Sequence, residues 1–302
     1  MQKIIDAFLY WGLRLLVCIL GALPWEMRKE IGFLLGKGFA RLPTKDRLVT
    51  MRQLDLFLPD QGGRKLLSMV YGNMGRTIME SFNLSPVLHS QSNKIICEDE
   101  KLLKLVATPP SGVVALTAHI GNWDLLAAYL IKRGVPLVPI GREARIPVFQ
   151  RLLVDLRQRY GIKTIWRTNK LGVKEIIHCL KQRKVVAGLI DQDTRVSSIM
   201  VPFFGRAASV PVGLVDLAKR YNCLILSGFI VRHGDQYRVH IYSIDANQTA
   251  FEILQQFHSQ LEAIIRRYPC QWVWNHKRWR TLESGRRLSS REYRQALEDN
   301  CW

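Results

Sequence analysis

The sequence predicts an α/β fold: an α/β/α sandwich with a mixed, largely parallel central sheet, preceded by an N-terminal helical region. From Gly112 onward, short β-branched runs alternate with amphipathic stretches, as in "GVVALTA", "WDLLAAYLIKRG" and "VPLVPI". This order is typical of a βαβ unit, in which the two strands are parallel and the crossover is right-handed. The chain has 302 residues, 48% of them hydrophobic, which is enough for a sizeable core.

The same alternation continues along the chain. "GIKTIW" predicts a strand, "LGVKEIIHCLKQRK" a helix, and "VVAGLI" a buried strand that ends at Asp191. "VPVGLVDLAKRYN" predicts a helix with Ser209 and Pro211 near its start. "CLILSGFIVRHGDQYRVHIYSI" predicts a hairpin that turns near Gly234, and a last helix covers about 249–268.

The N-terminal part predicts helices up to about residue 90, with apolar residues at three- and four-residue spacing. The first of them, at 4–25, is strongly apolar but is interrupted by Asp6 and Arg14. It predicts a marginal transmembrane anchor, or a helix lying in a membrane interface with Trp11 and Trp25 at headgroup level. A buried helix is the third reading.

We therefore divide the chain into a membrane-anchoring or interfacial helix at 1–27 and a main domain at 28–302. The main domain has a helical part at 28–95 and an α/β part at 96–302. Basic residues that flank the first helix suit a cytoplasmic membrane leaflet, namely Arg28, Lys29, Lys37 and Arg41.

The most unusual feature of the composition is its large excess of basic residues. Lys and Arg number 44 against 25 Asp and Glu, which gives a net charge of +19. Such an excess favours an anionic partner: nucleic acid, an anionic membrane surface or an acidic protein. The six cysteines form no Cys-x-x-Cys pair, so neither a zinc ribbon nor a disulfide framework is expected.

A histidine ends the first strand of the βαβ unit. His119 follows "VVALTA", Gly121 makes the turn, Asn122 caps the next helix and Asp124 lies in its first turn. From there the carboxylate can reach back to one ring nitrogen and leave the other free to take a proton. Asp191 ends another strand, so it is expected at the same edge of the sheet. The plainer reading is that Asp124 complements the helix dipole and His119 only caps the strand.

An oriented imidazole is suited to deprotonating an alcohol as that alcohol attacks a carbonyl. The sequence has no serine in a Gly-x-Ser-x-Gly setting. This absence favours direct acyl transfer to the acceptor hydroxyl, without a covalent acyl-enzyme.

Four motifs occur in order: "HIGNWD" at 119–124, "IDQDT" at 190–194, "VPFFGRAAS" at 201–209 and "CQWVWNHKRWR" at 270–280. Together they resemble the late acyltransferases of lipid A biosynthesis, the lauroyl and myristoyl transferases, within the wider His-x4-Asp/Glu glycerolipid acyltransferase group. The likeness extends over nearly the whole chain, including the apolar N-terminal helix and "MRQLDLFLPD".

The resemblance implies an enzyme of the inner membrane whose active site faces the cytoplasm. It would move a fatty acyl chain from acyl carrier protein, a co-substrate, to a hydroxyl of a lipid A precursor or related glycolipid, with no cofactor. His119 would be the general base and Asp124 its orienting partner. Many lipid A enzymes have Glu at the position of Asp124, and mycobacterial phosphatidylinositol mannoside acyltransferases share the "GNWD" style of motif. Another phospholipid or glycolipid acceptor is therefore the alternative.

Further residues are predicted to contact substrate. Arg142 and Arg145 lie nearest the predicted site in a basic run and suit a phosphate or an oxyanion. "VPFFGRAASVPVG" is apolar and suits the wall of an acyl-chain site. The substrate-binding set is Asn122, Arg142, Arg145, Asp191, Phe203, Phe204 and Gly205.

Two other functions compete with acyl transfer. Asp191 and Asp193 form an Asp-x-Asp that in a glycosyltransferase would hold a metal and a sugar nucleotide, but no further carboxylate follows, so no metal is expected. The second competing function is that of a non-enzymatic basic module that binds a membrane or nucleic acid. In 270–280, tryptophans alternate with basic residues. This pattern favours a strand at a membrane interface over a core-closing strand, and it favours nucleic-acid binding least.

Overall fold

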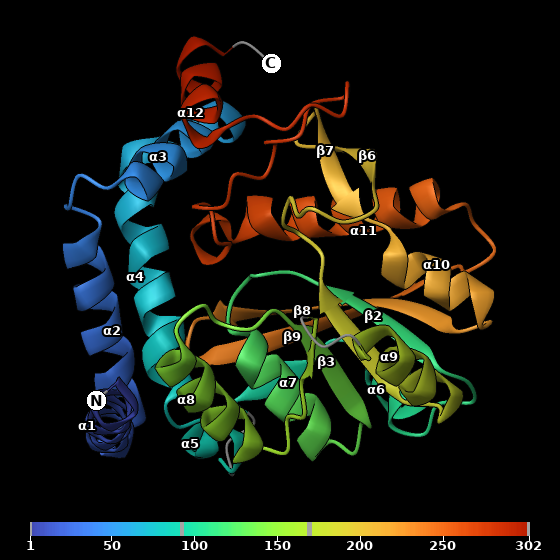
Figure 1. The fold of residues 1–302 in the computed structure, drawn as a ribbon, viewed down its shortest axis with the longest axis horizontal. Helices are drawn as coiled ribbons and strands as arrows, with labels where there is room; N and C mark the ends of the chain where they lie inside the picture. The colour runs from blue at the N-terminus through green and yellow to red at the C-terminus, as the bar shows by residue number, and fades with distance from the viewer. Residues whose placement is uncertain (1, 91–93, 168–170, 301–302) are drawn as a thin grey trace.

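A computed structural model describes residues 2–90, 94–167 and 171–300 of the protein. Its central feature is a seven-stranded sheet (Figure 1). The strands of this sheet are β1 (Ile95–Cys97), β2 (Val113–Thr117), β3 (Leu137–Gly141), β4 (Ile165–Trp166), β5 (Val185–Leu189), β8 (Leu224–His233) and β9 (Gln236–Ile244). Their order is β1-β9-β8-β2-β5-β3-β4, and every neighbouring pair is parallel except β8 and β9.

Helices cover both faces of the sheet (Figure 1). The α6 (Glu100–Ala107) and α7 (Trp123–Lys132) helices pack on one face, with α5 (Ser85–Leu88) beside them. The other face carries α9 (Gly172–Lys181), α10 (Gly213–Arg220) and α11 (Ala250–Arg267). The predicted α/β/α sandwich with a mixed, largely parallel sheet is therefore confirmed.

The sheet elements follow the sequence pattern closely. β2, β3, β4 and β5 lie at the β-branched runs, and α7 and α9 lie at amphipathic stretches between them. The α11 helix lies at the last predicted helix, after the hairpin. The hairpin of β8 and β9 turns at Gly234, whose φ of +59° lies in the left-handed region that glycine adopts without strain.

The N-terminal part is helical, as predicted, apart from short connections. Its main helices are α1 (Gln2–Ala22), α2 (Trp25–Phe39), α3 (Lys45–Phe57) and α4 (Gly63–Ser81), with a short 3-10 helix, η1 (Pro59–Gln61), between α3 and α4. Figure 1 shows α2 and α4 side by side along one flank of the molecule. The division of the chain at residues 27 and 95 stays a prediction.

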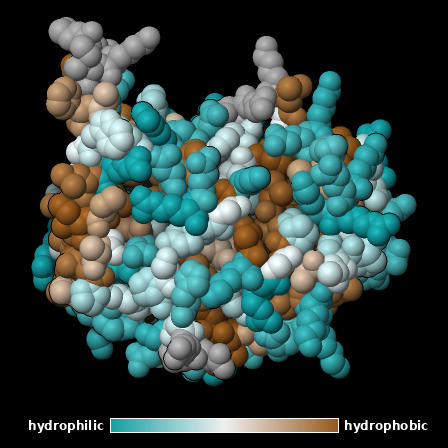
Figure 2. Space-filling model, turned by 90° about the horizontal axis from the view of Figure 1, so that it is seen from below, coloured by the Kyte–Doolittle hydropathy of each residue, from teal (hydrophilic) through white to brown (hydrophobic). Residues whose placement is uncertain are grey.

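The α1 helix presents a large apolar surface to solvent. Its segment Ile5–Ala22 is long and apolar enough to cross a membrane, and only 17% of it is buried inside the protein. Phe8, Trp11 and Leu15 are all more than half exposed. Figure 2 shows apolar atoms gathered along the left edge of the molecule, where Figure 1 places α1. This helix fits a membrane-associated region.

Two residues assigned to the membrane flank lie in the protein interior instead. Trp25 packs against Tyr237, and only 7% of it is exposed, so its predicted place at headgroup level is wrong. Arg28 is fully buried and donates to the carbonyl oxygens of Leu23 and Asn83. Both residues begin α2, where the chain leaves α1 and turns back into the core.

The segment after β5 differs from the sequence expectation. The strands β6 (Ser198–Phe203) and β7 (Arg206–Pro211) form a separate antiparallel pair, joined by a tight turn with positive φ at Phe204 and Gly205. Ser209 and Pro211 therefore lie in β7, and the following helix, α10, begins only at Gly213. The residues pair with β6 along their whole length, from Arg206 opposite Phe203 to Pro211 opposite Ser198, which makes this stretch a strand.

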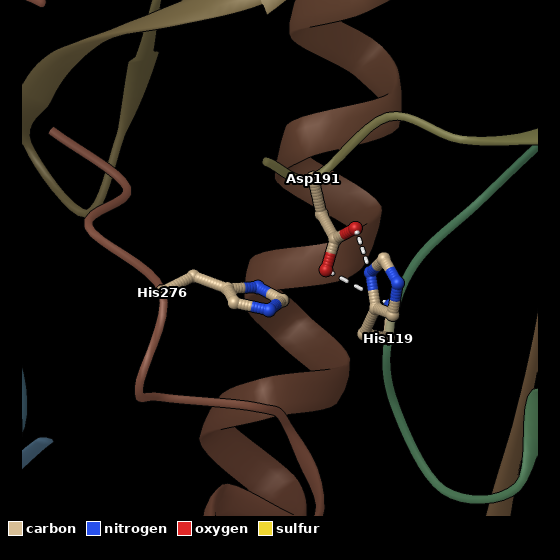
Figure 3. A group of neighbouring side chains, drawn as sticks. All are labelled: His119, Asp191 and His276. Atoms are coloured by element: carbon tan, nitrogen blue, oxygen red, sulfur yellow. Dashed lines mark hydrogen bonds and ion pairs between the residues drawn. The ribbon is translucent and has the colours of Figure 1, made fainter. Parts of the chain in front are cut away.

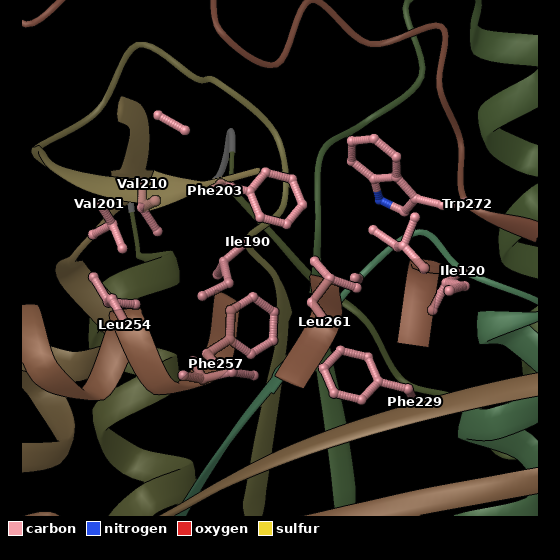
Figure 4. Close-up of a cluster of buried hydrophobic side chains, with 14 of the residues drawn as sticks. Ile120, Ile190, Val201, Phe203, Val210, Phe229, Leu254, Phe257, Leu261 and Trp272 are labelled. Carbon is pink, nitrogen blue, oxygen red and sulfur yellow. The ribbon is translucent and has the colours of Figure 1, made fainter. Parts of the chain in front are cut away.

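The tryptophan-rich segment at 270–280 is also corrected by the structure. It begins with a short helix, η2 (Pro269–Gln271), and then forms no regular strand, only a bridge between Trp272 and Ile120. Trp272, Trp274 and Trp279 are almost completely buried, so the predicted membrane interface is wrong here. Figure 4 shows Trp272 in a core cluster with Phe203 and Phe257. The strand β1 and the helices α6, α8 (Pro147–Gln158) and α12 (Ser290–Asp299) were not predicted from the sequence.

Candidate active site

His119 and Asp191 meet at the carboxyl edge of the sheet because of strand register. Thr117 at the end of β2 pairs with Leu189 at the end of β5, and the two strands are parallel. Two residues further along each strand, Oδ1 of Asp191 lies 2.8 Å from Nδ1 of His119 (Figure 3). The backbone N–H of His119 also donates to Oδ2 of Asp191 at 2.9 Å. The predicted convergence of these two residues is confirmed.

The carboxylate of Asp191 is charged although it is fully buried. Burial opposes ionisation, but the nearby His119 lowers the pKa of Asp191 well below its usual range. Nε1 of Trp272 donates to Oδ2 at 2.9 Å and completes the set of donors. A charged acceptor at Nδ1 favours the tautomer of His119 that carries its proton there, which leaves Nε2 to accept a proton. The His119 side chain is 21% exposed, so solvent and substrate can reach it.

His276 and Gln192 complete the polar group around the imidazole, and sequence reasoning missed both. The side-chain amide nitrogen of Gln192 lies 3.3 Å from each ring nitrogen of His119 and 2.9 Å from Nε2 of His276. Burial and the neighbouring His119 lower the pKa of His276 to about 3, so His276 is neutral at physiological pH. Both residues lie in sequence motifs noted above, "IDQDT" and "CQWVWNHKRWR", but spacing along the chain does not show that these motifs meet at His119.

The same side chains include a set that could hold a divalent metal. One ligand atom each from His119, Asp191 and His276 lies within 4.8 Å of the others (Figure 3). Two imidazoles and a carboxylate suit zinc. Both oxygens of Asp191 already accept hydrogen bonds from His119 and Trp272, however. The arrangement as it stands is a hydrogen-bonded base and carboxylate.

The predicted contact between Asp124 and the His119 ring is wrong. In the described part of the chain, no hydrogen bond joins them; Oδ1 of Asp124 instead accepts from Nε of Arg157 in α8 at 2.8 Å. The first turn of α7 carries the Asp124 side chain toward α8. The ring of Trp123 contacts the imidazole instead, at 5.1 Å between ring centroids.

The turn between His119 and α7 is held by buried contacts. Asn122 caps α7 as predicted, since its Oδ1 accepts from the backbone N–H of Leu125 at 2.9 Å. Its amide nitrogen donates to Glu80 of α4 at 2.9 Å, so this fully buried side chain supports the turn, and its contact with substrate stays a prediction. Gly121 has a φ of +62°, and a Cβ there would lie 2.0 Å from the carbonyl oxygen of Ile230. Only glycine fits this position.

The two arginines predicted to bind substrate lie in the loop after β3. Arg142 and Arg145 are exposed, and among the described residues neither has a hydrogen bond or ion pair. Because β3 is parallel to β5, this loop leaves the sheet at the same edge as Asp191. Both guanidinium groups are therefore available to an anionic ligand.

The predicted acyl-chain wall lies at the turn between β6 and β7. Phe203 is buried and stacks on Trp279, and Phe204 is 8% exposed, with its backbone N–H donating to Glu262. Gly205 is exposed, with a φ of +73°. The two phenylalanines are parts of the core, and contact with an acyl chain stays a prediction for all three residues.

The Asp-x-Asp pair is divided between two sets of partners. Asp193 accepts the backbone N–H of Thr281 at 2.6 Å and pairs with Arg287 at 2.8 Å. It therefore ties down the C-terminal segment, whereas Asp191 holds the His119 imidazole. Among the described residues, Asp193 is not part of the converging ligand set that includes Asp191.

Fold and site together define an α/β protein with a carboxylate-supported histidine at the carboxyl edge of its parallel strands. The family model for bacterial lipid A biosynthesis acyltransferases matches residues 2–281. The chain therefore belongs to the bacterial lipid A biosynthesis acyltransferase family, as the sequence motifs predicted.

Two relatives carry the name phosphatidylinositol mannoside acyltransferase. The protein from Mycolicibacterium smegmatis is 23% identical over 174 residues, which is 56% of this chain and 57% of that relative. The protein from Mycobacterium tuberculosis is 22% identical over 213 residues, 68% of this chain and 67% of the relative. The family and these names support an acyltransferase.

Proposed function

We propose that the protein is an O-acyltransferase that moves a fatty acyl chain from acyl carrier protein to a hydroxyl of a membrane glycolipid. A lipid A precursor is the first candidate acceptor, and a mannosylated or other membrane lipid is the second. The single observation that carries the proposal is the 2.8 Å contact between Asp191 and Nδ1 of His119, because it prepares Nε2 of His119 as a base.

In the proposed reaction, Nε2 of His119 takes the proton of the acceptor hydroxyl as its oxygen attacks the thioester carbonyl. The C–O bond forms, the tetrahedral intermediate collapses and the C–S bond breaks. His119 then returns the proton to the departing thiolate, which leaves as a thiol. Asp191 stabilises the imidazolium that exists between the two proton transfers. The acceptor oxygen is itself the nucleophile, so no acyl-enzyme is needed.

The charges of the site support an anionic substrate. Arg142 and Arg145 are exposed beside the carboxyl edge of the sheet and are free to bind a lipid phosphate or the acidic surface of a carrier protein. The net charge of +19 favours the same partners. For nucleic acid, the aromatic residues of 270–280 offer no stacking surface, since its three tryptophans are buried.

The proposed location is the inner membrane, with the active site facing the cytoplasm. Support comes from the apolar and mostly exposed helix α1 at the N-terminus. A lipid acceptor also resides in the membrane, so an anchored enzyme meets it at high local concentration.

The test is turnover with labelled acyl carrier protein and each acceptor lipid in turn, in the presence and absence of a chelator. We expect His119→Ala to abolish transfer while the protein stays folded. His178→Ala is the matched control, since His178 is an exposed histidine of α9. Turnover of His119→Ala near that of the unaltered protein would overturn the proposal, and activity that required a sugar nucleotide and a metal would favour a glycosyltransferase.

A further inference from the structure

The helix α4 contacts the turn that follows His119 at two points. The hydroxyl of Thr77 donates to the carbonyl oxygen of Gly121 at 2.8 Å. One helical turn further, Oε2 of Glu80 accepts from the amide nitrogen of Asn122 at 2.9 Å. Residues three apart lie on the same face of a helix, so one face of α4 holds two successive residues of the turn.

Glu80 is a buried charge that serves these contacts. Its oxygens also accept from Nε of Arg232 at 2.8 Å and from the hydroxyl of Tyr237 at 2.7 Å. Burial opposes ionisation, but Arg232 holds the pKa of Glu80 below its usual range. A buried ion pair contributes little net stability compared with well-packed apolar side chains. Its value here is to fix where Asn122 lies.

Thr77 belongs to the same network. Nη2 of Arg232 donates to the hydroxyl oxygen of Thr77 at 2.8 Å, while that hydroxyl donates to Gly121. Arg232 lies in β8, and Tyr237, which shares Glu80 with it, lies in β9. The network therefore joins α4, the central sheet and the turn beside the general base.

The helix α4 itself packs closely against α2. A Cβ on Gly32 would lie 2.5 Å from the carbonyl oxygen of Gly75, and one on Gly36 would lie 2.1 Å from the carbonyl oxygen of Tyr71. The two helix backbones are therefore in direct contact at these glycines. From its other side the turn is fixed by the backbone N–H of Gly121, which donates to Gln271 at 3.0 Å.

We infer that Thr77 and Glu80 are positioning residues, which hold the Gly121–Asn122 turn so that His119 keeps Nε2 toward the substrate. This inference rests on the proposed function, in which His119 is the general base. It assigns a role in the reaction to a helix from the N-terminal part of the chain, outside the sheet that carries the base. Small changes in the orientation of a base cost rate even when the fold survives.

Thr77→Val is the sharpest test, because it removes a hydroxyl and keeps the side-chain volume. We expect kcat to fall about tenfold or more, as for the loss of one well-placed hydrogen bond, with KM changed less than about twofold. Amide hydrogen exchange at 118–124 should become faster, while exchange in the strands stays the same. Thr77→Ser restores the hydroxyl and should restore both kcat and slow exchange.

Ser81→Ala is the matched control. Its hydroxyl lies one turn along α4 and donates to the carbonyl oxygen of Thr77, without touching the turn. It should leave kcat and exchange at 118–124 unchanged. Glu80→Gln is the second variant; it keeps the side-chain shape but replaces the charged carboxylate that accepts from Asn122 with a neutral amide. It should speed exchange in the same segment and lower kcat at least as much as Thr77→Val.

The inference is overturned if Thr77→Val keeps both the kcat and the slow exchange of the unaltered protein. It is also overturned if kcat falls only in proportion to a general loss of folded protein, with exchange rising everywhere. The proposed function fails by a different result, activity of His119→Ala. In that case the exchange experiment still reports on whether α4 holds the turn, so the two failures can be told apart.

Discussion

Asp191 and His119 lie side by side because each follows the end of one of two adjacent parallel strands by the same number of residues. Their side chains come from positions 72 residues apart in the chain. The carboxylate that orients the imidazole is therefore supplied by the neighbouring strand and not by the first turn of the following helix. This pairing decides which of two aspartates should matter most for the proton transfer.

Asp191→Asn should lower kcat much more than Asp124→Asn does. The amide cannot stabilise the imidazolium and favours the wrong tautomer of His119, which costs about 10⁴-fold in kcat in comparable base–carboxylate pairs. Asp124→Asn loses the ion pair with Arg157, so it should mainly weaken the link between α7 and α8. Steady-state kinetics and thermal melts of both variants measure the contrast.

The two side chains provide the control for each other, since both substitutions remove one carboxylate charge near the same site. A larger loss of kcat in Asp124→Asn, with Asp191→Asn close to the unaltered protein, would contradict the assignment. It would mean that the orienting contact changes when substrate binds.

Gly121→Ala should damage both stability and activity. The residue has a φ of +62°, and the added methyl carbon would lie 2.0 Å from the backbone oxygen of Ile230. A left-handed conformation costs a non-glycine residue about 1–2 kcal/mol, and the overlap adds about 1–3 kcal/mol. Gly134→Ala is the control, because it has a φ of +83° but open space around it. Denaturant unfolding should show the smaller loss in Gly134→Ala, and equal losses would contradict the steric argument.

The contact between α2 and α4 gives a third prediction. Gly32→Ala would place a methyl carbon 2.5 Å from the backbone of α4 and should lower the free energy of unfolding by about 1–3 kcal/mol. Gly38→Ala lies in the same helix with nothing within 4 Å, so it should be neutral or slightly stabilising. Thermal melts of the two variants measure the difference. A melting temperature for Gly32→Ala equal to that of Gly38→Ala would show that the helices can separate without cost.

Most strands and helices of the α/β part could be predicted from the sequence because each of them has a local pattern. Buried parallel strands appear as short β-branched runs, and the helices between them carry apolar residues at helical spacing. The β6–β7 pair could not be separated from the start of α10, since Ser209 and Pro211 suit a helix N-terminus as well as the end of a strand. In the tryptophan-rich segment, burial depends on how distant parts of the chain pack, which spacing does not encode.

The site could be predicted only in part, for a related reason. His119 and the cap at Asn122 depend on a strand, a turn and a helix that are adjacent in sequence, and both were found. The partner of the imidazole depends on strand order, because β5 happens to lie next to β2 in the sheet. His276 and Glu80 reach the site from a loop and a helix at opposite ends of the chain. His276 lies in the motif at 270–280, but local patterns do not show that this motif or Glu80 packs against the turn after His119.

The histidine of α11 links stability to pH. His258 is fully buried; its Nδ1 donates to the carbonyl oxygen of Leu254 at 2.8 Å, and Nη2 of Arg278 donates to its Nε2 at 3.0 Å. Both nitrogens are therefore used by the neutral ring. Burial and the adjacent Arg278 lower the pKa of His258 to about 3.

A histidine whose pKa is depressed by folding should make the protein less stable in mild acid. Above the unfolded pKa of about 6.5 the ring is neutral in both states, and below it the unfolded chain binds the proton more readily. At pH 5 this difference costs about 2 kcal/mol of unfolding free energy. Urea unfolding at pH 7 and pH 5 should show a smaller loss in His258→Gln than in the unaltered protein, with His178→Gln, an exposed histidine, unchanged. An identical loss in His258→Gln would mean that His258 is not buried as a neutral ring.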